Sequence, residues 1–233
     1  MAAKIVKCGT GDNVRRAAFA RERPMKLYDC KVAPNPRRVN VFLAEKGIEI
    51  EKEQVDLMQG GQFDPAYQAI NPRCVVPSLV LDDGTVIGEA AAICRYLEEL
   101  HPEPSLYGRT PLERARIAMW EQRTLNDGIG AIGEAFRNRA SAFKDRALPG
   151  PKKYAQIEAL IERGRERALQ FWEEVDGELA KHEFVAGGSF SVADINLLVM
   201  IDFAKWIKLE VPENLANLRR WYAAVSARPS AQG

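Results

Sequence analysis

One stretch, residues 71–96, constrains the fold of this chain more than any other, because it reads as a hairpin that leads directly into a helix. Residues 75–81 and 85–87 are rich in Val, Ile and Leu, as expected for two short strands. Asp83-Gly84 lies between them and supplies the positive φ that a tight hairpin turn requires. Apolar residues then recur at helical spacing from Glu89, whose carboxylate would lie in the first turn, where the helix dipole favours negative charge. The stretch predicts a strand, a turn, a second strand and a helix.

Pro77 is the unusual residue of this stretch, because it stands at the head of an apolar strand. Proline enters a sheet only at an edge, at the first residue of a strand or at a bulge, and a cis Val76–Pro77 bond would resolve the conflict. The patterns N-P-x-x-x-V-P-x-L from Asn71 and G-E-x-x-A-I-x-x-Y-L from Gly88 resemble the glutathione-binding half of the glutathione transferase family. That half is a thioredoxin-like domain, and the resemblance implies that the bond is cis.

The resemblance extends from residue 25 to about residue 229 and implies the two-domain fold of the family. We expect an α+β thioredoxin-like N-terminal domain at 25–100, in which helices pack on a mixed four-stranded sheet. Residues 101–109 contain His-Pro-Glu-Pro and read as a linker. Residues 110–233 have helical patterns without strand signals, and are expected to form an all-α helical bundle that carries the second-substrate pocket.

The resemblance also implies where glutathione binds. In the family, the residue before the cis proline offers its main-chain N–H and C=O to the cysteinyl part of glutathione, and Val76 and Pro77 occupy these positions. The N-terminus of the following helix takes the γ-glutamyl carboxylate, which assigns Glu89 and Ala90. Exposed N–H groups and the positive end of a helix dipole bind a carboxylate without a basic side chain. Ala90 departs from the usual Ser, so a hydroxyl contact is lost while the main-chain contact remains.

The turn at Ala33-Pro34-Asn35-Pro36 is where the family carries the residue that hydrogen-bonds the glutathione sulfur. Ala33 falls at the usual Ser position and has no hydrogen bond to give, so we assign the catalytic role to Asn35. We expect Asn35 to cap a helix that begins at Pro36, which leaves its amide NH₂ free to donate to a thiolate. The Ala-Pro-Asn turn also resembles the Thr-Pro-Asn turn of the bacterial Nu-class branch, although Ala33 lacks the Thr hydroxyl.

A second group of candidates lies in two Gly-rich segments. Residues 55–57 are expected to continue as a strand into G-G-Q-F, where the resemblance makes Gln62 a contact for the glycine carboxylate of glutathione; a solvated loop amide is the alternative. Residues 128–133 read G-x-G-x-x-G, but they lie in a helical stretch with no preceding strand, so a dinucleotide site is not expected. These glycines are expected to allow close approach of helices or of a ligand. Family architecture makes this region the second-substrate pocket, with the candidates Asn126, Ile129, Phe136 and Arg137.

The C-terminal half contains its own folding signals. Thr110-Pro111 opens one expected helix, and residues 154–179 read as a long amphipathic helix with a solvated acidic face. Ser191-Val192-Ala193-Asp194 is an S-x-x-D capping box before an apolar run, and it resembles the helical-domain signature of the family. Its expected role is in folding, so it is not assigned to the site.

Composition excludes several other classes of function. Lys+Arg 33 against Asp+Glu 32 gives a net charge of +1, so no global field attracts nucleic acid or an anionic membrane. No apolar run is long enough to span a membrane. The two histidines and four cysteines have no metal-ligand or C-x-x-C spacing, so we expect no metal and a cytoplasmic location. Cys74 and Cys94 read as packed thiols, and Cys30 reads as the thiol nearest the site. Residues 1–24 are Arg-rich and read as a disordered or non-native extension rather than a targeting arm.

The sequence thus predicts a glutathione transferase in which bound glutathione supplies the nucleophile, for attack on a small electrophile or reduction of a disulfide. Two alternatives stay open: a glutaredoxin-like thiol transferase, disfavoured because the turn carries no Cys, and a binding or dimerisation module without activity, favoured by Ala33 and Ala90. A homodimer is expected from the habit of the family. The second substrate and the transferase class are not readable from the sequence.

Overall fold

The computed structural model describes residues 25–232, so the expectations for residues 1–24 lie outside it. Its N-terminal part contains a four-stranded sheet in the order β2-β1-β3-β4. The pair β1 and β2 is parallel, whereas β1 with β3 and β3 with β4 are antiparallel, which confirms the expected mixed sheet. The strands are β1 (Lys26–Asp29), β2 (Glu51–Gln54), β3 (Ser78–Val80) and β4 (Val86–Gly88).

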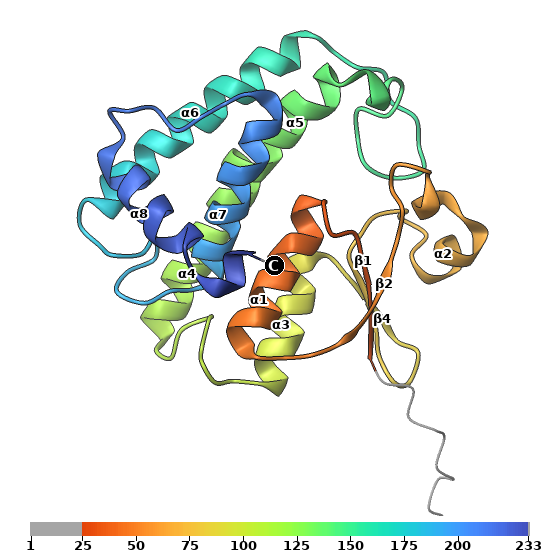
Figure 1. The fold of residues 1–233 in the computed structure, drawn as a ribbon, viewed down its shortest axis with the longest axis horizontal. Coiled ribbons are helices and arrows are strands. Elements are labelled where there is room, and N and C mark those ends of the chain that lie inside the picture. Colours follow the sequence, from red (N-terminus) through yellow and green to blue (C-terminus); the bar gives the residue numbers. More distant parts are fainter. Residues whose placement is uncertain (1–24, 233) are drawn as a thin grey trace, which may run out of the picture.

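Helices cover both faces of this sheet (Figure 1). On the inner face, α1 (Pro34–Lys46) and α3 (Ala90–Leu100) pack side by side, with Phe42 and Ile93 fully buried against Leu27 and Leu79 of the central strands. On the other face lies the short helix α2 (Pro65–Ile70), which follows the 3₁₀ turn η1 (Gly61–Phe63). The domain is thioredoxin-like, as the resemblance to the glutathione transferase family implied.

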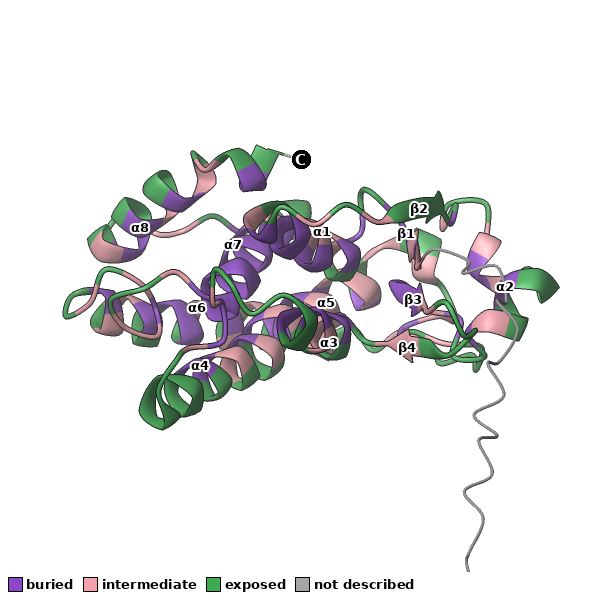
Figure 2. Ribbon diagram, turned by 90° about the horizontal axis from the view of Figure 1, so that it is seen from below, coloured by how far each residue is buried: buried purple, intermediate pink, exposed green. Residues whose placement is uncertain are grey.

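The second domain is all-helical and packs on the outer side of α1 and α3 (Figures 1 and 2). Its central helix is α7, which is surrounded by α1, α4, α5 and α8, so nearly every one of its residues is buried (Figure 2). A helix that is apolar on all sides is expected only where neighbours cover it completely. The helices are α4 (Pro111–Arg123), α5 (Gly130–Arg139), α6 (Ala159–Leu179), α7 (Val192–Ala204) and α8 (Ala216–Ser226).

Short irregular helices complete the chain. A π-helical segment, η2 (Thr124–Ile129), joins α4 to α5, and the others are η3 (Ser141–Phe143), η4 (Lys205–Ile207) and η5 (Pro229–Gln232). The last of these lies against α1, where the Arg37 guanidinium donates to the Ala231 carbonyl at 3.2 Å. The end of the chain therefore ties the helical domain to the thioredoxin-like domain. No helix among residues 25–232 is long and apolar enough to cross a membrane.

The glycines of the G-x-G-x-x-G segment lie within η2 and α5, as expected, and the small size of Gly128 serves packing. A Cβ built on Gly128 would lie 2.5 Å from the sulfur of Met200 in α7. A Cβ on Gly164 of α6 would likewise lie 2.4 Å from the carbonyl oxygen of Ala131 in α5. Glycine at these positions lets neighbouring helices approach more closely than a side chain would allow.

The expected strand at 55–57 and the expected helix start at Tyr154 are not found. The strand β2 ends at Gln54, and the expected continuation at 55–57 instead turns, with the Asp56 carboxylate accepting from the N–H groups of Met58 and Gln59. The helix α6 begins at Ala159 and not at Tyr154, because Tyr154 pairs through its main chain with the 145–147 segment in an isolated bridge. In both places a local turn or long-range pairing replaces the regular element.

Candidate functional site

The Val76–Pro77 peptide bond is cis, as expected. Two side chains fix the loop: the Val75 carbonyl accepts from the Tyr67 hydroxyl at 2.6 Å and from the Asn71 amide at 2.9 Å. By contrast, neither main-chain polar group of Val76 has a hydrogen-bond partner among residues 25–232. The loop therefore presents the free N–H and C=O of Val76. An extended peptide can form main-chain hydrogen bonds with such a pair of groups.

The N-terminus of α3 follows directly after β4. Glu89 is its N-cap residue and adopts a positive φ of 64°, and no side chain caps the helix. The Ala90 side chain is buried and adds no polar group. On the surface, the Arg73 guanidinium lies 3.5 Å from the Glu89 carboxylate. The N–H groups of the first turn therefore have no capping acceptor, and together with the helix dipole they favour an anion.

The N-terminus of α1 corrects one prediction. The helix begins at Pro34, Ala33 is the N-cap residue, and Asn35 lies inside the first turn, so the expectation that Asn35 caps the helix is wrong. Ala33 has the extended backbone of a cap residue, and Pro34 has the fixed φ suited to the first helical position. Because Pro34 and Pro36 have no N–H, the Asn35 N–H is the main-chain donor left at this end, and it has no acceptor in the described part of the chain.

The side chain of Asn35 is exposed, and Arg38 one turn later holds its oxygen. Nη1 of Arg38 donates to Oδ1 of Asn35 at 3.2 Å. The amide oxygen is thus engaged by a side chain rather than by the helix end. The amide NH₂ stays available, as predicted, but for a different reason.

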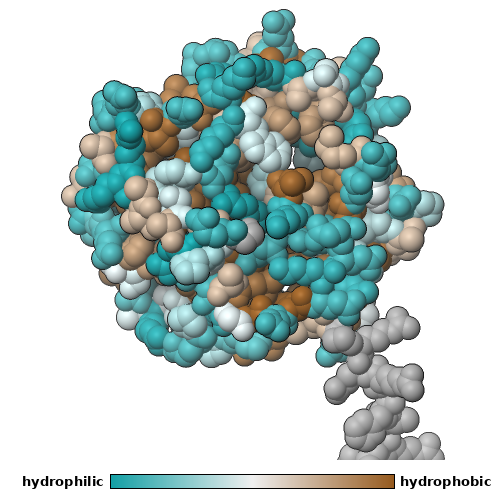
Figure 3. Space-filling view, viewed as in Figure 1, coloured by the Kyte–Doolittle hydropathy of each residue, from teal (hydrophilic) through white to brown (hydrophobic). Residues whose placement is uncertain are grey.

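The cis-proline loop and the start of α1 are brought together by a small apolar cluster. Ala33 and Val76 are both buried in it, next to Cys30, Val55 and Tyr67. Figure 3 shows this face of the molecule hollowed near the N-terminal end of α1, where the two domains meet. The structure therefore places the predicted thiol-binding turn beside the predicted main-chain binding loop.

Gln62 lies in η1 and is only 6% exposed, so the alternative of a solvated loop amide is wrong. Its Oε1 is buried without a hydrogen-bond partner among residues 25–232. The amide NH₂ is the donor group of this side chain. A donor is what recognition of a carboxylate needs.

The four candidates of the second-substrate pocket lie in different surroundings. Phe136 contacts the rings of Phe143, Phe203 and Trp206 edge to face, and Arg137 lies over Phe143. Arg137 also donates to the carbonyls of Ala147 and Arg146, and burial and the nearby Arg146 lower its pKa to about 10.

Asn126 is exposed and hydrogen-bonded to Gln122 and Arg167, and Ile129 packs on the helical core. Phe136 and Arg137 share one aromatic surface, which Asn126 does not join.

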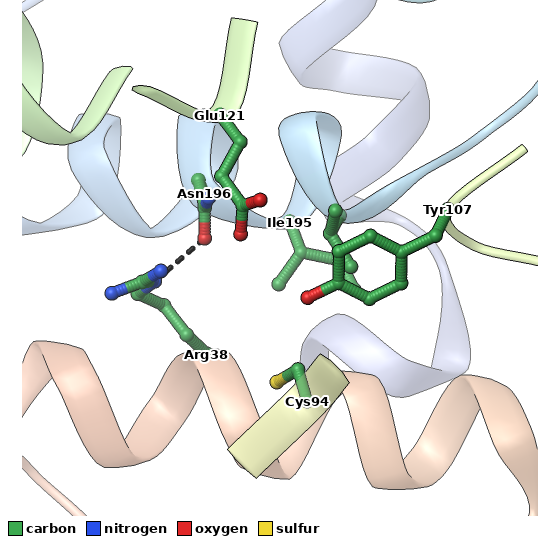
Figure 4. Close-up of a pocket in the computed structure, with 7 residues that line it drawn as sticks. Arg38, Cys94, Tyr107, Glu121, Ile195 and Asn196 are labelled. Carbon is green, nitrogen blue, oxygen red and sulfur yellow. Dashed lines mark hydrogen bonds between the residues drawn. The ribbon is translucent and has the colours of Figure 1, made fainter. Parts of the chain in front are cut away.

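A polar cluster between the domains escaped the sequence analysis (Figure 4). Arg38 of α1 points across the interface toward Asn196 of α7 and Glu121 of α4, and the space among them is too small for a water molecule. Asn35 and Arg38 are three residues apart on one helix, which was the available signal. Burial raises the pKa of Cys94 in this cluster to about 12, and the other described cysteines, Cys30 and Cys74, are also buried free thiols.

A thioredoxin-like domain with a cis-proline loop, followed by an all-helical domain, defines a two-domain class of thioredoxin-fold proteins. Two family models match the chain: the glutathione S-transferase N-terminal domain over residues 32–100 and the glutathione S-transferase C-terminal domain over residues 158–224. The chain belongs to the glutathione S-transferase family, as its motifs predicted.

Related proteins agree over nearly the whole chain. Glutathione S-transferase 2 of Saccharomyces cerevisiae is 34% identical over 227 residues, 95% of this chain and 94% of the relative. The structure of Gtt2 from the same yeast is 34% identical with a TM-score of 0.81, covering 89% of this chain and 98% of that chain. A glutathione S-transferase domain-containing protein from Marinobacter aquaeolei is 36% identical with a TM-score of 0.82, covering 88% and 99%.

Proposed function

We propose that the protein is a glutathione transferase that lowers the pKa of the bound glutathione thiol and directs the thiolate to a small electrophile or a disulfide. The observation that carries the proposal is the pair of unused main-chain groups of Val76, which lies before cis Pro77 and beside the start of α1. Such a pair fits the cysteinyl part of a peptide thiol, whose own N–H and C=O would complete it.

The remaining residues supply the other contacts. The uncapped first turn of α3 at Glu89 and Ala90 suits the γ-glutamyl carboxylate, and Nε2 of Gln62 suits the glycine carboxylate. Ala33 lies in the same apolar cluster as Val76, and its methyl group offers no hydrogen bond. The surface around Phe136 and Arg137 is where we place the electrophile, and Asn126 and Ile129 remain weaker candidates.

Asn35 is the residue that we assign to the thiolate. It offers two donors, its main-chain N–H and its side-chain NH₂, at the positive end of α1. A hydrogen bond to a charged group contributes about 1.5–3 kcal/mol, and roughly 1.4 kcal/mol shifts a pKa by one unit. With the helix dipole, this is enough to bring a thiol from about 8.5 to near neutral.

The substitution Asn35→Ala tests this role. We expect the pKa of the bound glutathione thiol to rise by about one unit and turnover at neutral pH to fall about tenfold, since the side-chain donor is lost and the main-chain N–H stays. Glutathione affinity should change little, because Val76, Glu89 and Gln62 are intact. The measurement is a spectroscopic titration of the bound thiolate beside initial rates. An unchanged thiol pKa and rate would contradict the assignment.

Two assays separate this proposal from its alternatives. Retention on immobilised glutathione distinguishes a transferase from a binding or dimerisation module that has lost the ligand. Conjugation of an aryl halide, measured beside reduction of a small disulfide, then decides which reaction dominates. A glutaredoxin-like mechanism needs a reactive protein thiol, and the described cysteines are all buried. From the habit of the family we also propose a homodimer. The free thiols favour a reducing compartment, and we propose that the protein works in the cytoplasm.

A further inference from the structure

Asn35 is connected to the helical domain through one buried side chain, Arg38, whose bond to Asn196 is drawn in Figure 4. Nη1 of Arg38 donates to Oδ1 of Asn35 at 3.2 Å, and Nε donates to Oδ1 of Asn196 in α7 at 2.6 Å. Arg38 is 5% exposed and Asn196 is 2% exposed. One guanidinium therefore bridges two amides that belong to different domains.

The chemistry of this bridge fixes the orientation of both amides. A guanidinium has only donors, so each amide must turn its oxygen toward Arg38. The NH₂ group of Asn35 is consequently directed away from Arg38, and a rotation of the amide by 180° would set two sets of donors against each other. Arg38 thus selects the orientation in which Asn35 can donate to an anion.

The position of Arg38 is in turn determined by the helical domain. Burial lowers the pKa of Arg38, and a buried guanidinium is costly unless oxygen atoms face it. Asn196 supplies one oxygen, and Figure 4 shows the Glu121 carboxylate of α4 beside it. Burial also raises the pKa of Glu121, although Arg38 and Arg95 oppose this. The other titratable side chains that line this space, Cys94 and Tyr107, have burial-raised pKa values and add no charge at neutral pH.

We propose that Arg38 is the positioning residue of the thiol site: held by Asn196, it orients the Asn35 amide so that its NH₂ faces the glutathione sulfur. This inference rests on the proposed function of Asn35. It adds that a residue of the helical domain, Asn196, sets the strength of thiol activation in the other domain without touching glutathione.

The substitution Arg38→Lys isolates this role, because it keeps the positive charge but cannot bridge two amides with a planar fork of donors. We expect the pKa of the bound thiol to rise by about 0.5 to 1 unit, with glutathione affinity unchanged. In an Asn35→Ala background the same substitution should have no further effect on that pKa. A purely structural role would give equal effects in both backgrounds.

The neighbouring Arg37 provides the matched control. It also bridges the domains, with Nη1 2.6 Å from Asp202 of α7 and Nη2 on the Ala231 carbonyl, but it makes no contact with Asn35. Arg37→Lys should leave the thiol pKa unchanged. Should Arg38→Lys fold poorly, Asn196→Ala is the second test: it keeps the Arg38 side chain but removes the acceptor that holds it, and should still raise the thiol pKa.

The outcomes separate the two proposals. If Asn35→Ala raises the thiol pKa while Arg38→Lys and Asn196→Ala leave it at the wild-type value, the positioning role is wrong and the role of Asn35 stands. If Arg37→Lys and Arg38→Lys shift it equally, the effect is general to the interface and the positioning role is again wrong. If Asn35→Ala itself has no effect, both proposals fail together.

Discussion

Asp194 and Asn196 are two residues apart on α7 and belong to two different polar clusters. Asp194 is completely buried within the helical domain, and its carboxylate accepts from the N–H groups of Val185 and Ser191, the Ser191 hydroxyl and the Trp221 indole, each at 3.0 Å. Asn196 faces the other domain, accepts from Arg38 through its Oδ1 at 2.6 Å, and lies beside the Glu121 carboxylate (Figure 4).

The difference between the clusters separates folding from function. Four donors of the helical domain converge on Asp194, so this network holds one domain together, whereas the bond from Arg38 to Asn196 joins two domains. The S-x-x-D box was predicted to serve folding, and the contacts of Asp194 agree with that expectation. Asn196 forms one end of a bridge that ends at Asn35, the residue that we propose for the thiol site. One helix thus anchors the helical core and, through its opposite face, contacts Arg38 of the thioredoxin-like domain.

The largest expected effect is on stability, from Asp194→Ala. The substitution leaves four buried donors from three residues without an acceptor, and we expect the free energy of unfolding to fall by about 3–5 kcal/mol at about pH 5. Urea denaturation followed by circular dichroism measures this. The thiol pKa of the protein that remains folded should match wild type; a changed thiol pKa would mean that the two clusters are coupled.

Asn196→Ala should have a smaller effect on stability and a larger one on function. It removes a single acceptor from Arg38, where Asp194→Ala leaves four donors without one, so a loss of about 1–2 kcal/mol is expected from the same denaturation experiment. The thiol pKa should rise in this variant and not in Asp194→Ala. A stability loss equal to that of Asp194→Ala would show that the bridge to Arg38 mainly holds the domains together.

The smallest expected effect is a dependence of the Asp194→Ala cost on pH. Burial raises the pKa of Asp194 to about 6, so the folded state binds a proton that the unfolded state has released between about pH 4 and pH 6. Stability from this group is therefore lost as pH rises, and the cost of Asp194→Ala should be about 1 kcal/mol smaller at about pH 7 than at about pH 5. The cost of Asn196→Ala should stay constant over this range. The opposite slope for Asp194→Ala would mean that hydrogen bonds outweigh burial.

Much of the fold could be predicted from local sequence. Asp83-Gly84 indicated the hairpin, and Thr110-Pro111 indicated the start of α4, where Glu113 and Thr110 indeed form a capping box. The start of α1 could not be decided in this way, because Pro34 and Pro36 are equally good first residues for a helix. In the structure Ala33 has an extended backbone and is the N-cap residue, so the helix begins at Pro34 and Asn35 is not the cap.

The sequence alone determined the features that depend on one turn or one hairpin, namely the hairpin and most helix starts. Its motifs also indicated the family. Only the tertiary structure decided how Asn35 is oriented, since its oxygen meets Arg38, and Arg38 meets a residue 158 positions further along the chain. The physical reason is that a buried guanidinium takes the acceptors that packing brings to it, and local sequence does not specify which acceptors those are.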